Sequence, residues 1–432
     1  MTKSATNGRK KLTSLSLFTG AGGLDLGLER AGFSVQLCVE LDEASRATLR
    51  SNRSAWRLAE PGDIHLLTPG EILDQAGVKR GELTLLAGGP PCQPFSKSSY
   101  WVSGDTLRLR DPRAQTLRAY LRLVEHALPE IILLENVKGL AFDKKDEGLT
   151  LLKRGLDRIN REYGVRYVPH VVHLNSVDYG VPQLRERVFV IAHRDGKAFT
   201  KPSPTHGPVE KLVDALQPYR TAWEAIGDLD GDRWPDELNV TGKWAMLLPS
   251  IPEGGNYLWH TARGGGMPLF GWRTRFWSFL LKLAKNQPSW TIQAQPGPAT
   301  GPFHWRSRRL SIRELCRLQT FPDGHKIVGS YREAHVQVGN AVPPVIGELL
   351  GLAIRRQFFG EDVAERPKLP SIHAGECPDP EKPQAVPVTY RSLKGKHRDH
   401  PGPGLGPGAR KRAKVKRSKE QPTHTRVRQP AA

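Results

Sequence analysis

The sequence has few cysteines and no long apolar run, and each shortage excludes a class of protein. Its 432 residues include four cysteines, Cys38, Cys92, Cys316 and Cys377. No two of them form a CxxC pair, so we expect no zinc or other metal site. No stretch approaches the ~18 uninterrupted apolar residues of a membrane span, and residues 1–11 lack the apolar core of a secretory signal. We therefore expect a soluble protein of a reducing compartment, where a free thiol persists.

Positive charge is in large excess. The chain carries 64 Lys and Arg against 44 Asp and Glu, a formal net charge of +20. Thirteen basic and two acidic residues lie between Arg391 and Arg428, a surplus of +11, and the remainder is spread over the body of the chain. Such a surplus indicates a polyanionic partner, because Lys and Arg that neutralise phosphates release counterions. A basic tail on an otherwise ordinary enzyme is the alternative.

The first half of the chain alternates between short apolar runs and segments of helical spacing. This alternation predicts an α/β fold with a doubly wound, mostly parallel, Rossmann-like sheet, whose ligands bind at the carboxyl ends of the strands. The predicted strands are Leu12–Phe18, Val35–Val39, Leu83–Ala87, Ile131–Leu134 and Val188–Ala192.

The second half changes character near Pro202. Eight of the ten tryptophans lie between His206 and Trp305, in a Gly- and Pro-rich stretch that indicates a smaller, irregular domain. Regular helices are predicted again at Ser311–Gln319, with Ser311 as N-cap, and at Val345–Phe358. The expected parts are a disordered N-terminus (1–11), a main domain (12–205), the small domain (206–305), a C-terminal part that packs back on the main domain (306–360) and a disordered basic tail (361–432).

A glycine turn follows the first predicted strand, in Phe18-Thr19-Gly20-Ala21-Gly22-Gly23. Glycines let a backbone approach a ligand closely, and the helix N-terminus behind them offers free N–H groups. Glu40 ends the next strand, where a carboxylate suits the two hydroxyls of a ribose, and Asp63 follows. Together they favour an adenosine-containing cofactor over a plain tight turn. The spacing is not G-x-G-x-x-G, which argues against NAD.

Cys92 lies in a stiff loop, Gly88-Gly89-Pro90-Pro91-Cys92-Gln93-Pro94, directly after the third predicted strand. A cysteine in such a loop is poorly placed for core packing and well placed to act as a thiolate nucleophile. Cys38, within an apolar strand, is predicted to be core.

Two further charged motifs follow apolar runs. Glu135, in Glu135-Asn136-Val137, ends the fourth strand, where partial desolvation raises the pKa of a carboxyl. A helix cap or a structural salt bridge is the alternative. Arg185 and Arg187, in Gln183-Leu184-Arg185-Glu186-Arg187, lie at the mouth of the last strand, where alternate residues share a face. They could hold a carbonyl and a phosphate, or form an ordinary solvated charge run.

These motifs, in this order, resemble the conserved blocks of the DNA cytosine-5 methyltransferases of prokaryotic restriction–modification systems. Two later segments add to the resemblance, Arg309–Pro322 and Gln337–Pro344. The resemblance covers about Leu12 to Phe358. One departure is Leu41, where many members carry an aromatic residue that stacks on adenine.

The resemblance implies methyl transfer from S-adenosyl-L-methionine to C5 of a cytosine in duplex DNA. Cys92 would add to C6, Glu135 would engage N3 and the exocyclic amine, Arg187 would hold O2, and Arg185 would support the site. The target base would be flipped out of the helix. The resemblance assigns the cofactor to Phe18, Gly20, Gly23, Glu40, Asp63, Pro91 and Asn340.

Contacts to DNA are expected from two regions. The polar stretch from Ser96 to Arg113, with Lys97, is predicted to close over flipped DNA as a mobile loop, or to be an ordinary basic surface loop. Residues 206–305 would form the target recognition domain, in which each of three arginines could read a guanine, contact phosphate or simply pack. These are Arg263, Arg273 and Arg275.

Three other functions compete with this interpretation. A tRNA cytosine-5 methyltransferase would share the fold, but the large variable region favours a reader of duplex DNA. A non-catalytic DNA-binding relative would have a damaged Cys92, Glu135 or Gly20 position, and none is damaged. A nicotinamide oxidoreductase would not explain Pro-Pro-Cys-Gln beside Glu-Asn-Val. The interpretation further predicts a cytoplasmic, nucleoid-associated monomer without a membrane anchor, and a restriction endonuclease of the same specificity as its partner.

Overall fold

The computed structural model describes residues 11–90, 115–137, 147–211, 216–271 and 277–396. Its main feature is a six-stranded sheet with the strand order β2-β1-β3-β4-β7-β5. The first four strands of this order run parallel, and β7 is antiparallel to both β4 and β5. The strands are β1 (Thr13–Leu17), β2 (Ser34–Val39), β3 (Leu85–Gly88), β4 (Ile131–Asn136), β5 (His170–Asn175) and β7 (Glu186–His193).

The α/β fold and all five predicted strands are confirmed, with the mixed sheet parallel over its first four strands. β5 was not predicted. It is the edge strand, and its sequence HVVHLN has half-exposed and exposed residues between buried ones, so it lacks the continuous apolar run that marks the inner strands.

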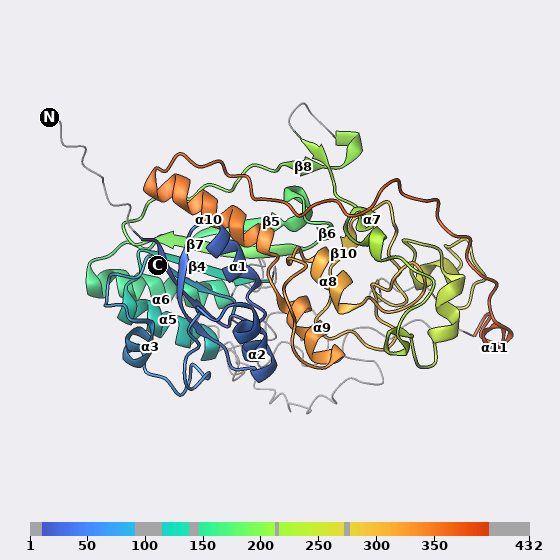
Figure 1. The fold of residues 1–432 in the computed structure, drawn as a ribbon, viewed down its shortest axis with the longest axis horizontal. Helices are drawn as coiled ribbons and strands as arrows, with labels where there is room; N and C mark the ends of the chain where they lie inside the picture. The colour runs from blue at the N-terminus through green and yellow to red at the C-terminus, as the bar shows by residue number, and fades with distance from the viewer. Residues whose placement is uncertain (1–10, 91–114, 138–146, 212–215, 272–276, 397–432) are drawn as a thin grey trace, which may run out of the picture.

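Helices cover both faces of the sheet (Figure 1). The helices are α1 (Gly23–Arg30), α2 (Glu43–Asn52), α3 (Pro69–Ala76), α5 (Gln115–Ala127), α6 (Glu147–Tyr163), α7 (Ala222–Ile226), α8 (Ile312–Leu318), α9 (Tyr331–Asn340), α10 (Pro344–Phe359) and α11 (Val388–Arg391). Short 3-10 turns are η3 (Ser176–Tyr179), η4 (Val209–Lys211), η5 (Gly227–Leu229), η6 (Asp236–Leu238), η7 (Ala245–Ser250) and η8 (Tyr257–His260). Four two-residue strands are β6 (Gln183–Leu184), β8 (His206–Gly207), β9 (Gln217–Pro218) and β10 (Ser289–Trp290).

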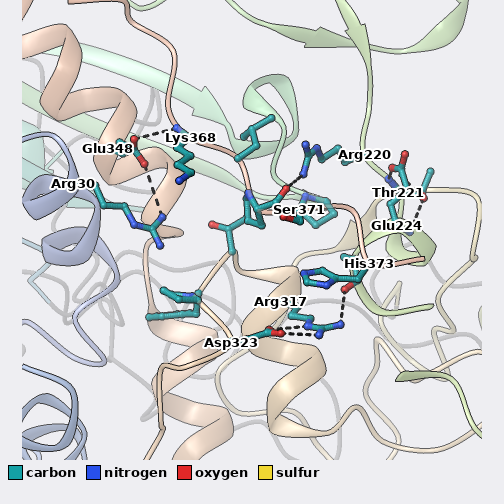
Figure 2. Close-up of a pocket in the computed structure, with 17 residues that line it drawn as sticks. Arg30, Arg220, Thr221, Glu224, Arg317, Asp323, Glu348, Lys368, Ser371 and His373 are labelled. Carbon is teal, nitrogen blue, oxygen red and sulfur yellow. Dashed lines mark hydrogen bonds and ion pairs between the residues drawn. The ribbon is translucent and has the colours of Figure 1, made fainter. Parts of the chain in front are cut away.

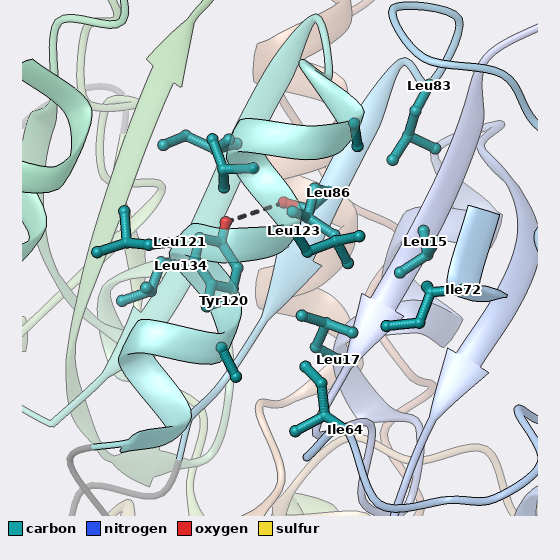
Figure 3. Packing of buried hydrophobic residues seen from close by; sticks show 14 of the residues in the cluster. Leu15, Leu17, Ile64, Ile72, Leu83, Leu86, Tyr120, Leu121, Leu123 and Leu134 are labelled. Carbon is teal, nitrogen blue, oxygen red and sulfur yellow. Dashed lines mark hydrogen bonds between the residues drawn. The ribbon is translucent and has the colours of Figure 1, made fainter. Parts of the chain in front are cut away.

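Alternate residues of the inner strands feed two separate cores, as the pleat of a strand requires. Leu86 faces the cluster that contains α3, α5 and α6, whereas Leu85 faces the cluster that contains α1 and α10. Figure 3 shows the first cluster, in which the Tyr120 hydroxyl on α5 donates a hydrogen bond to the Leu86 carbonyl (3.2 Å). The near-continuous apolar sequence of these strands follows from their burial on both faces.

The last long helix packs against the first, as predicted. A Cβ atom on Gly27 of α1 would lie 2.3 Å from the Pro344 carbonyl oxygen, and one on Gly347 would lie 2.5 Å from the Leu24 carbonyl oxygen. Only glycines permit this approach of two helix backbones. The C-terminal part of the chain is thereby fixed beside the glycine turn that opens α1.

The region from His206 to Trp305 is irregular, as expected from its glycines and prolines. Its apolar core includes Leu247, Leu248 and Leu280, with Trp244 and Trp259 packed against it. Trp223 and Trp305 belong instead to a cluster shared with α1 and α8. The tryptophans of this region are therefore divided between two apolar cores, one within the region and one shared with α1 and α8.

The helix predicted at Ser311–Gln319 is confirmed as α8. The Ser311 hydroxyl accepts a hydrogen bond from the Glu314 backbone N–H, and the Glu314 carboxylate accepts one from the Ser311 backbone N–H, so the predicted capping box is present. The closing helix predicted at Val345–Phe358 is α10.

The disorder expected from residue 361 onward is wrong over residues 361–396, which we call the C-terminal strap. In Figure 1 the strap runs from α10 across the molecule to α11. Its backbone is held at intervals by the rest of the fold, and Tyr390 is buried against Trp244 with ring centroids 5.9 Å apart. A Pro-rich composition fits an extended, docked segment as well as a disordered one, and only long-range contacts separate the two. The contacts include Lys368 N–H to Glu348 Oε1 (3.0 Å), His373 N–H to Glu224 O (3.0 Å) and Tyr390 O–H to Lys243 O (2.7 Å).

By length and composition, the described part of the chain has one stretch apolar enough to cross a membrane, Tyr331–Phe359, which contains α9 and α10. Of its apolar window, 89% is buried inside the fold. This burial identifies the stretch as a core element.

Candidate active site

The carboxyl edge of the sheet brings together the motifs that were predicted to carry chemistry. β3 ends at Gly88 and leads into Gly89 and Pro90, while Glu135 is the second-last residue of the adjacent β4. β7 runs antiparallel to β4, so its first residues return to the same edge. Glu135 pairs with Phe189 in this ladder, and Arg187, two residues before Phe189, lies diagonally across from Glu135, although 51 intervening residues separate Glu135 and Arg187 in the sequence.

Glu135 and Arg187 form an ion pair at this edge. Arg187 Nε lies 3.0 Å from Glu135 Oε1, and the two side chains are only 15% and 12% exposed. Burial raises the pKa of the Glu135 carboxyl, and the positive charges of Arg187 and Arg185 act against that rise. The carboxyl therefore keeps its proton to a higher pH than a surface carboxyl does.

The loop that leads to Cys92 is tied to the same strand. Asn136 Nδ2 donates a hydrogen bond to the Pro90 carbonyl (3.2 Å), and a Cβ on Gly89 would lie 3.1 Å from Glu135 Oε2. The glycine therefore leaves the carboxylate oxygen room for a ligand. Pro91 and Cys92 themselves lie outside the described residues.

Arg185 is fully buried and is directed away from solvent. Its Nη2 donates to the carbonyls of Gly339 and Ala341, each at 2.8 Å, and its Nη1 donates to the Ile292 carbonyl (3.4 Å). Its backbone N–H donates to Asn175 Oδ1 (2.9 Å). The side chain joins the end of α9 to the carboxyl edge of the sheet.

At the other end of the site, Glu40 meets the glycine turn. Glu40 Oε2 accepts a hydrogen bond from the Gly20 N–H (2.7 Å), and Oε1 accepts one from the Asp42 N–H (2.8 Å). Burial raises the pKa of Glu40, and these backbone donors oppose the rise. Gly20 has φ +57°, and the space where its Cβ would lie is open. Phe18 also has a positive φ, +58°, so the chain turns sharply out of β1.

Asp63 is brought next to Glu40 by a close backbone contact. A Cβ on Gly62 would lie 2.2 Å from the Glu40 carbonyl oxygen. The buried Arg46 joins the same two segments, because its Nη1 donates to the carbonyls of Glu40 (3.1 Å) and Ala59 (3.0 Å). Leu41, beside Glu40, is 70% exposed, an apolar surface that a flat ring could cover.

The segment after Asn340 reaches the glycine turn from the C-terminal part of the chain. Asn340 is the exposed last residue of α9. A Cβ on Gly23 would lie 2.2 Å from the Val342 carbonyl oxygen, so only glycine fits there. Phe18, Gly20, Gly23, Glu40, Asp63 and Asn340 therefore lie on segments that converge around one end of β1 and β2.

Two residues that hold the site together had no role predicted from the sequence. Gln183 Nε2 donates to Gln319 Oε1 (3.2 Å), and Gln319 Nε2 donates to the Val338 carbonyl (2.7 Å). Both amides are fully buried, and Gln183 Oε1 accepts from the Ile292 N–H (3.2 Å). A polar amide within an otherwise apolar or charged motif was the available signal.

The expected DNA-contacting residues are mostly not described. Arg263 is exposed, in a turn where Gly264 and Gly266 donate backbone hydrogen bonds to Thr261 and Trp259. Ser96, Lys97, Arg113, Arg273 and Arg275 lie outside the described residues. Among the side chains that the structure does describe, no group of three or more His, Cys, Asp or Glu is arranged to hold a metal ion.

A cavity of about 560 Å³ lies between α7, α8 and the C-terminal strap (Figure 2). None of the predicted site residues lines it. Its charged groups are largely satisfied by one another: Arg317 Nη2 lies 2.7 Å from Asp323 Oδ2, and Arg30 Nη1 lies 3.8 Å from Glu348 Oε2. The cavity is a seam beneath the strap, and its contacts point to no particular ligand.

The chain is similar to a known enzyme family over most of its length. Residues 12–356 match the family model described as C-5 cytosine-specific DNA methylase. The chain is similar to the type II methyltransferase M.SacI of Streptomyces achromogenes, with 38% identity over 81% of this chain and 94% of the relative. It is also similar to the type II methyltransferase M.NgoFVII of Neisseria gonorrhoeae, with 32% identity over 76% of this chain and 83% of the relative.

Among solved structures, the fold is similar to that of Spodoptera frugiperda DNMT2, with a TM-score of 0.54 and 17% identity over 79% of this chain and 99% of the other. Dnmt2 methyltransferase of S. pombe gives a TM-score of 0.53 at 17% identity over 80% and 99% of the two chains. At these identities the likeness shows the fold alone.

Proposed function

We propose that Cys92, Glu135, Arg185 and Arg187 carry out the reaction of this protein, which belongs to the C-5 cytosine-specific DNA methylases. That reaction is methyl transfer from S-adenosyl-L-methionine to cytosine C5 in DNA. The observation that supports this most is the desolvated Glu135–Arg187 pair, 3.0 Å between Oε1 and Nε. It lies beside Gly89 and Pro90, which precede Cys92 in the sequence.

Cys92 and Glu135 would activate a ring that is too electron-poor at C5 to take a methyl group unaided. The Cys92 thiolate forms a bond to C6, and the electron pair of the C5–C6 double bond moves toward C5. Glu135, protonated or hydrogen-bonded to N3 and the exocyclic amine, stabilises the charge that develops on the ring. The pair at C5 would form the new bond to the methyl group that S-adenosyl-L-methionine supplies when bound, and the cofactor sulfur would keep the pair of the broken S–CH3 bond. Loss of the C5 proton would then let the C5–H pair re-form the C5–C6 double bond, while the Cys92 thiolate leaves with the pair of the C6–S bond. Acid–base assistance of this kind contributes roughly 10²–10⁴-fold in rate.

The two arginines would have different tasks. The half-buried Arg187 already neutralises part of the Glu135 charge and can donate to the base carbonyl O2 from the same edge. Arg185 has its guanidinium committed to the carbonyls of Gly339 and Ala341, so it is a positioning residue. The pair thus divides into one group that contacts the base and one that holds the walls of the site.

The residues at the end of β1 and β2 fit S-adenosyl-L-methionine. The open space at Gly20, the desolvated Glu40 carboxylate and the exposed Leu41 suit a backbone-bound chain, a ribose and an adenine. The cofactor, when bound, supplies an electrophilic methyl group. Phe18, Gly20 and Gly23 would line it, Glu40 would accept the ribose hydroxyls, Asp63 the adenine amine, and Pro91 and Asn340 would close the walls.

DNA would be bound between two parts of the protein. One part is the main domain (12–205) together with residues 306–360, and the other is the recognition domain (206–305). A target cytosine inside a stacked duplex cannot reach Glu135, so the base must be flipped out, at a cost of a few kcal/mol. Ser96, Lys97 and Arg113 would contact the flipped strand. Arg263, Arg273 and Arg275 are candidates for contacts to bases or phosphates.

The names of the relatives support a biological setting. Both the Streptomyces and Neisseria proteins are type II methyltransferases. By analogy, this chain would protect host DNA in a restriction–modification system, with a restriction endonuclease of the same specificity as its partner. It would act as a monomer in the cytoplasm, associated with the nucleoid.

Bisulfite sequencing of DNA from cells that express the protein tests this function and gives the recognised word. The wild-type chain and Cys377→Ser, which changes an exposed cysteine of the strap, should methylate one cytosine in a single short sequence. Cys92→Ser should leave that sequence unmethylated. Methylation by Cys92→Ser, or none by the wild type, would contradict the proposal.

A further inference from the structure

One aromatic side chain on the recognition domain is exposed without an evident role. Of the eight tryptophans that the structure describes, Trp277 alone is exposed, with 47% of its surface accessible. The others are buried or half-buried. A tryptophan that presents this much apolar ring to solvent gains little from packing, and such rings are commonly found where a partner covers them.

The Trp277 ring packs against a neighbouring ring, and its backbone is anchored to the fold. It packs edge-on against Trp290, with ring centroids 5.3 Å apart and an interplanar angle of 69°. Its backbone carbonyl accepts a hydrogen bond from Nδ2 of the buried Asn256 (2.8 Å), and Leu280, three residues on, is fully buried. The exposed ring is therefore part of an anchored segment.

Trp290 connects this pair to the catalytic edge. It lies on β10, which pairs with β6 so that Trp290 is opposite Leu184, and Figure 1 places the two short strands between the main sheet and the recognition domain. The partners Ser289 and Gln183 are buried, whereas Trp290 and Leu184 are half-buried, so this ladder has one open face. Thr291 Oγ1 donates to the Leu184 carbonyl (2.5 Å) and fixes the register.

The spacing along the chain brings the pair within reach of bound DNA. Arg187, which holds Glu135, is three residues after Leu184, a span of at most about 11 Å. Paired strands lie about 5 Å apart, and DNA rises about 3.4 Å per base pair. A duplex that delivers a cytosine to Glu135 therefore passes within a few base pairs of Trp290 and of the ring above it.

We propose that Trp277, backed by Trp290, is a stacking residue for substrate DNA: its ring packs on the face of a nucleotide near the target cytosine. Stacking requires an apolar face rather than a hydrogen-bonding edge, and an exposed indole on a rigid support provides one. The contact would contribute to affinity without adding an ion pair. Loss of one such stack typically weakens binding roughly 5- to 100-fold.

The test is a series of variants in the full-length protein, assayed on the duplex whose sequence bisulfite analysis has defined. Trp277→Ala should raise the Kd for that duplex roughly 5- to 100-fold, Trp277→Phe should keep most of the affinity, and Trp277→Leu should behave like Trp277→Ala. The slope of log Kd against log salt should stay unchanged in all three, because no phosphate contact is lost. Met246→Ala removes a side chain of similar exposure (66%) on the same domain and should bind as wild type.

Two further measurements separate stacking from a structural role. The thermal midpoint and the affinity for S-adenosyl-L-methionine should not change in Trp277→Ala. Duplexes with an abasic site at each position beside the target should show one position at which the wild-type advantage over Trp277→Ala disappears, and that position identifies the stacked base. An advantage kept at every position would contradict stacking on a base.

The proposal is overturned if Trp277→Ala binds the duplex within twofold of wild type. It is equally overturned if the loss follows a lower thermal midpoint, or if Trp277→Leu binds as tightly as Trp277→Phe. Because these are affinities of a protein whose methylation is measured separately, failure here leaves the Cys92 mechanism untouched.

Discussion

Glu135 Oε1 on β4 lies 3.0 Å from Arg187 Nε on β7. In the described sheet, β7 is the one neighbour of β4 that runs antiparallel to it. The reversal of β7 is what brings an arginine from later in the chain to the carboxyl end of β4. A purely parallel sheet would place the start of a strand at the opposite edge. The mixed topology is therefore part of the chemistry, because it sets a cation beside a desolvated carboxyl.

Replacing Glu135 with glutamine tests its acid–base role. Gln keeps the size and can still hydrogen-bond, but it cannot supply a proton, so kcat should fall roughly 10²–10⁴-fold while DNA binding persists. Burial raises the pKa of Glu135, so wild-type kcat should decline as pH rises above that pKa, and the decline should be absent in Glu135→Gln. Single-turnover methylation across pH measures both effects.

The matched control is Glu125→Gln, which breaks a carboxylate–arginine pair between the last turn of α5 and α6. It should keep wild-type kcat and the same pH profile. Equal losses in the two variants would assign Glu135 a structural role only.

Arg185→Lys tests the positioning role of the buried guanidinium. Lysine keeps the charge but cannot donate to the carbonyls of Gly339 and Ala341 in the same geometry, and unsatisfied buried groups cost about 1–3 kcal/mol each. We expect a lower thermal midpoint together with at least a several-fold weaker affinity for S-adenosyl-L-methionine, measured by calorimetry.

Arg194→Lys is the comparison. Arg194 Nη1 also donates to two carbonyls, those of Gly81 (3.1 Å) and Leu128 (2.7 Å), at the other end of the sheet. This variant should lose stability but keep cofactor affinity. A similar loss of cofactor affinity in both variants would mean that Arg185 acts through global stability.

Truncations separate the strap from the basic tail that follows it. Ending the chain after Lys396 should leave the thermal midpoint and turnover unchanged and reduce the salt dependence of DNA binding, since it removes basic residues and keeps the whole strap. Ending it after Gly360 should also lower the midpoint by several degrees, because Tyr390 and the strap contacts are lost. Equal midpoints for the two truncations would show that the strap adds no stability.

Asp25 should make the stability of the fold depend on pH. It is 1% exposed in the first turn of α1, and burial raises its pKa from 3.8 to about 7, against a lowering contribution from Ser16. The folded state therefore binds the proton more tightly than the unfolded state, so its contribution to stability falls as pH rises from about 4 to about 7 and is constant above.

Asp25→Asn removes this effect. The variant should match the wild type in thermal midpoint near pH 4 and exceed it at pH 8, as measured by thermal unfolding at both values. A constant difference between the two proteins across pH would contradict the raised pKa of Asp25.

Elements built from local sequence signals were predictable. The inner strands are uninterrupted apolar runs, and α8 begins at a serine with glutamate three residues later, so each element carries its own signal. The glycine turn and Glu135 follow strands directly, and the rule that parallel strands gather their ligands at the carboxyl edge was enough to bring them together.

Features that depend on distant partners were not predictable. The carbonyls bound by Arg185 lie 154 and 156 residues away, and no spacing rule connects them. Tyr390 docks on Trp244 only because the strap follows a path across the whole molecule. β5 owes its place to pairing with β7 rather than to its own sequence.

Trapping with 5-fluorocytosine tests the central claim most directly. Fluorine at C5 cannot leave as a proton does, so a duplex that carries the analogue at the target position should hold the enzyme covalently once the methyl donor is added. We expect the wild type and Cys377→Ser to form a complex that resists denaturation, and mass spectrometry should show the DNA attached to the peptide that contains Cys92. Cys92→Ser should form no such complex. A trapped complex with Cys92→Ser, or none with the wild type under conditions where it methylates the normal duplex, would contradict the account.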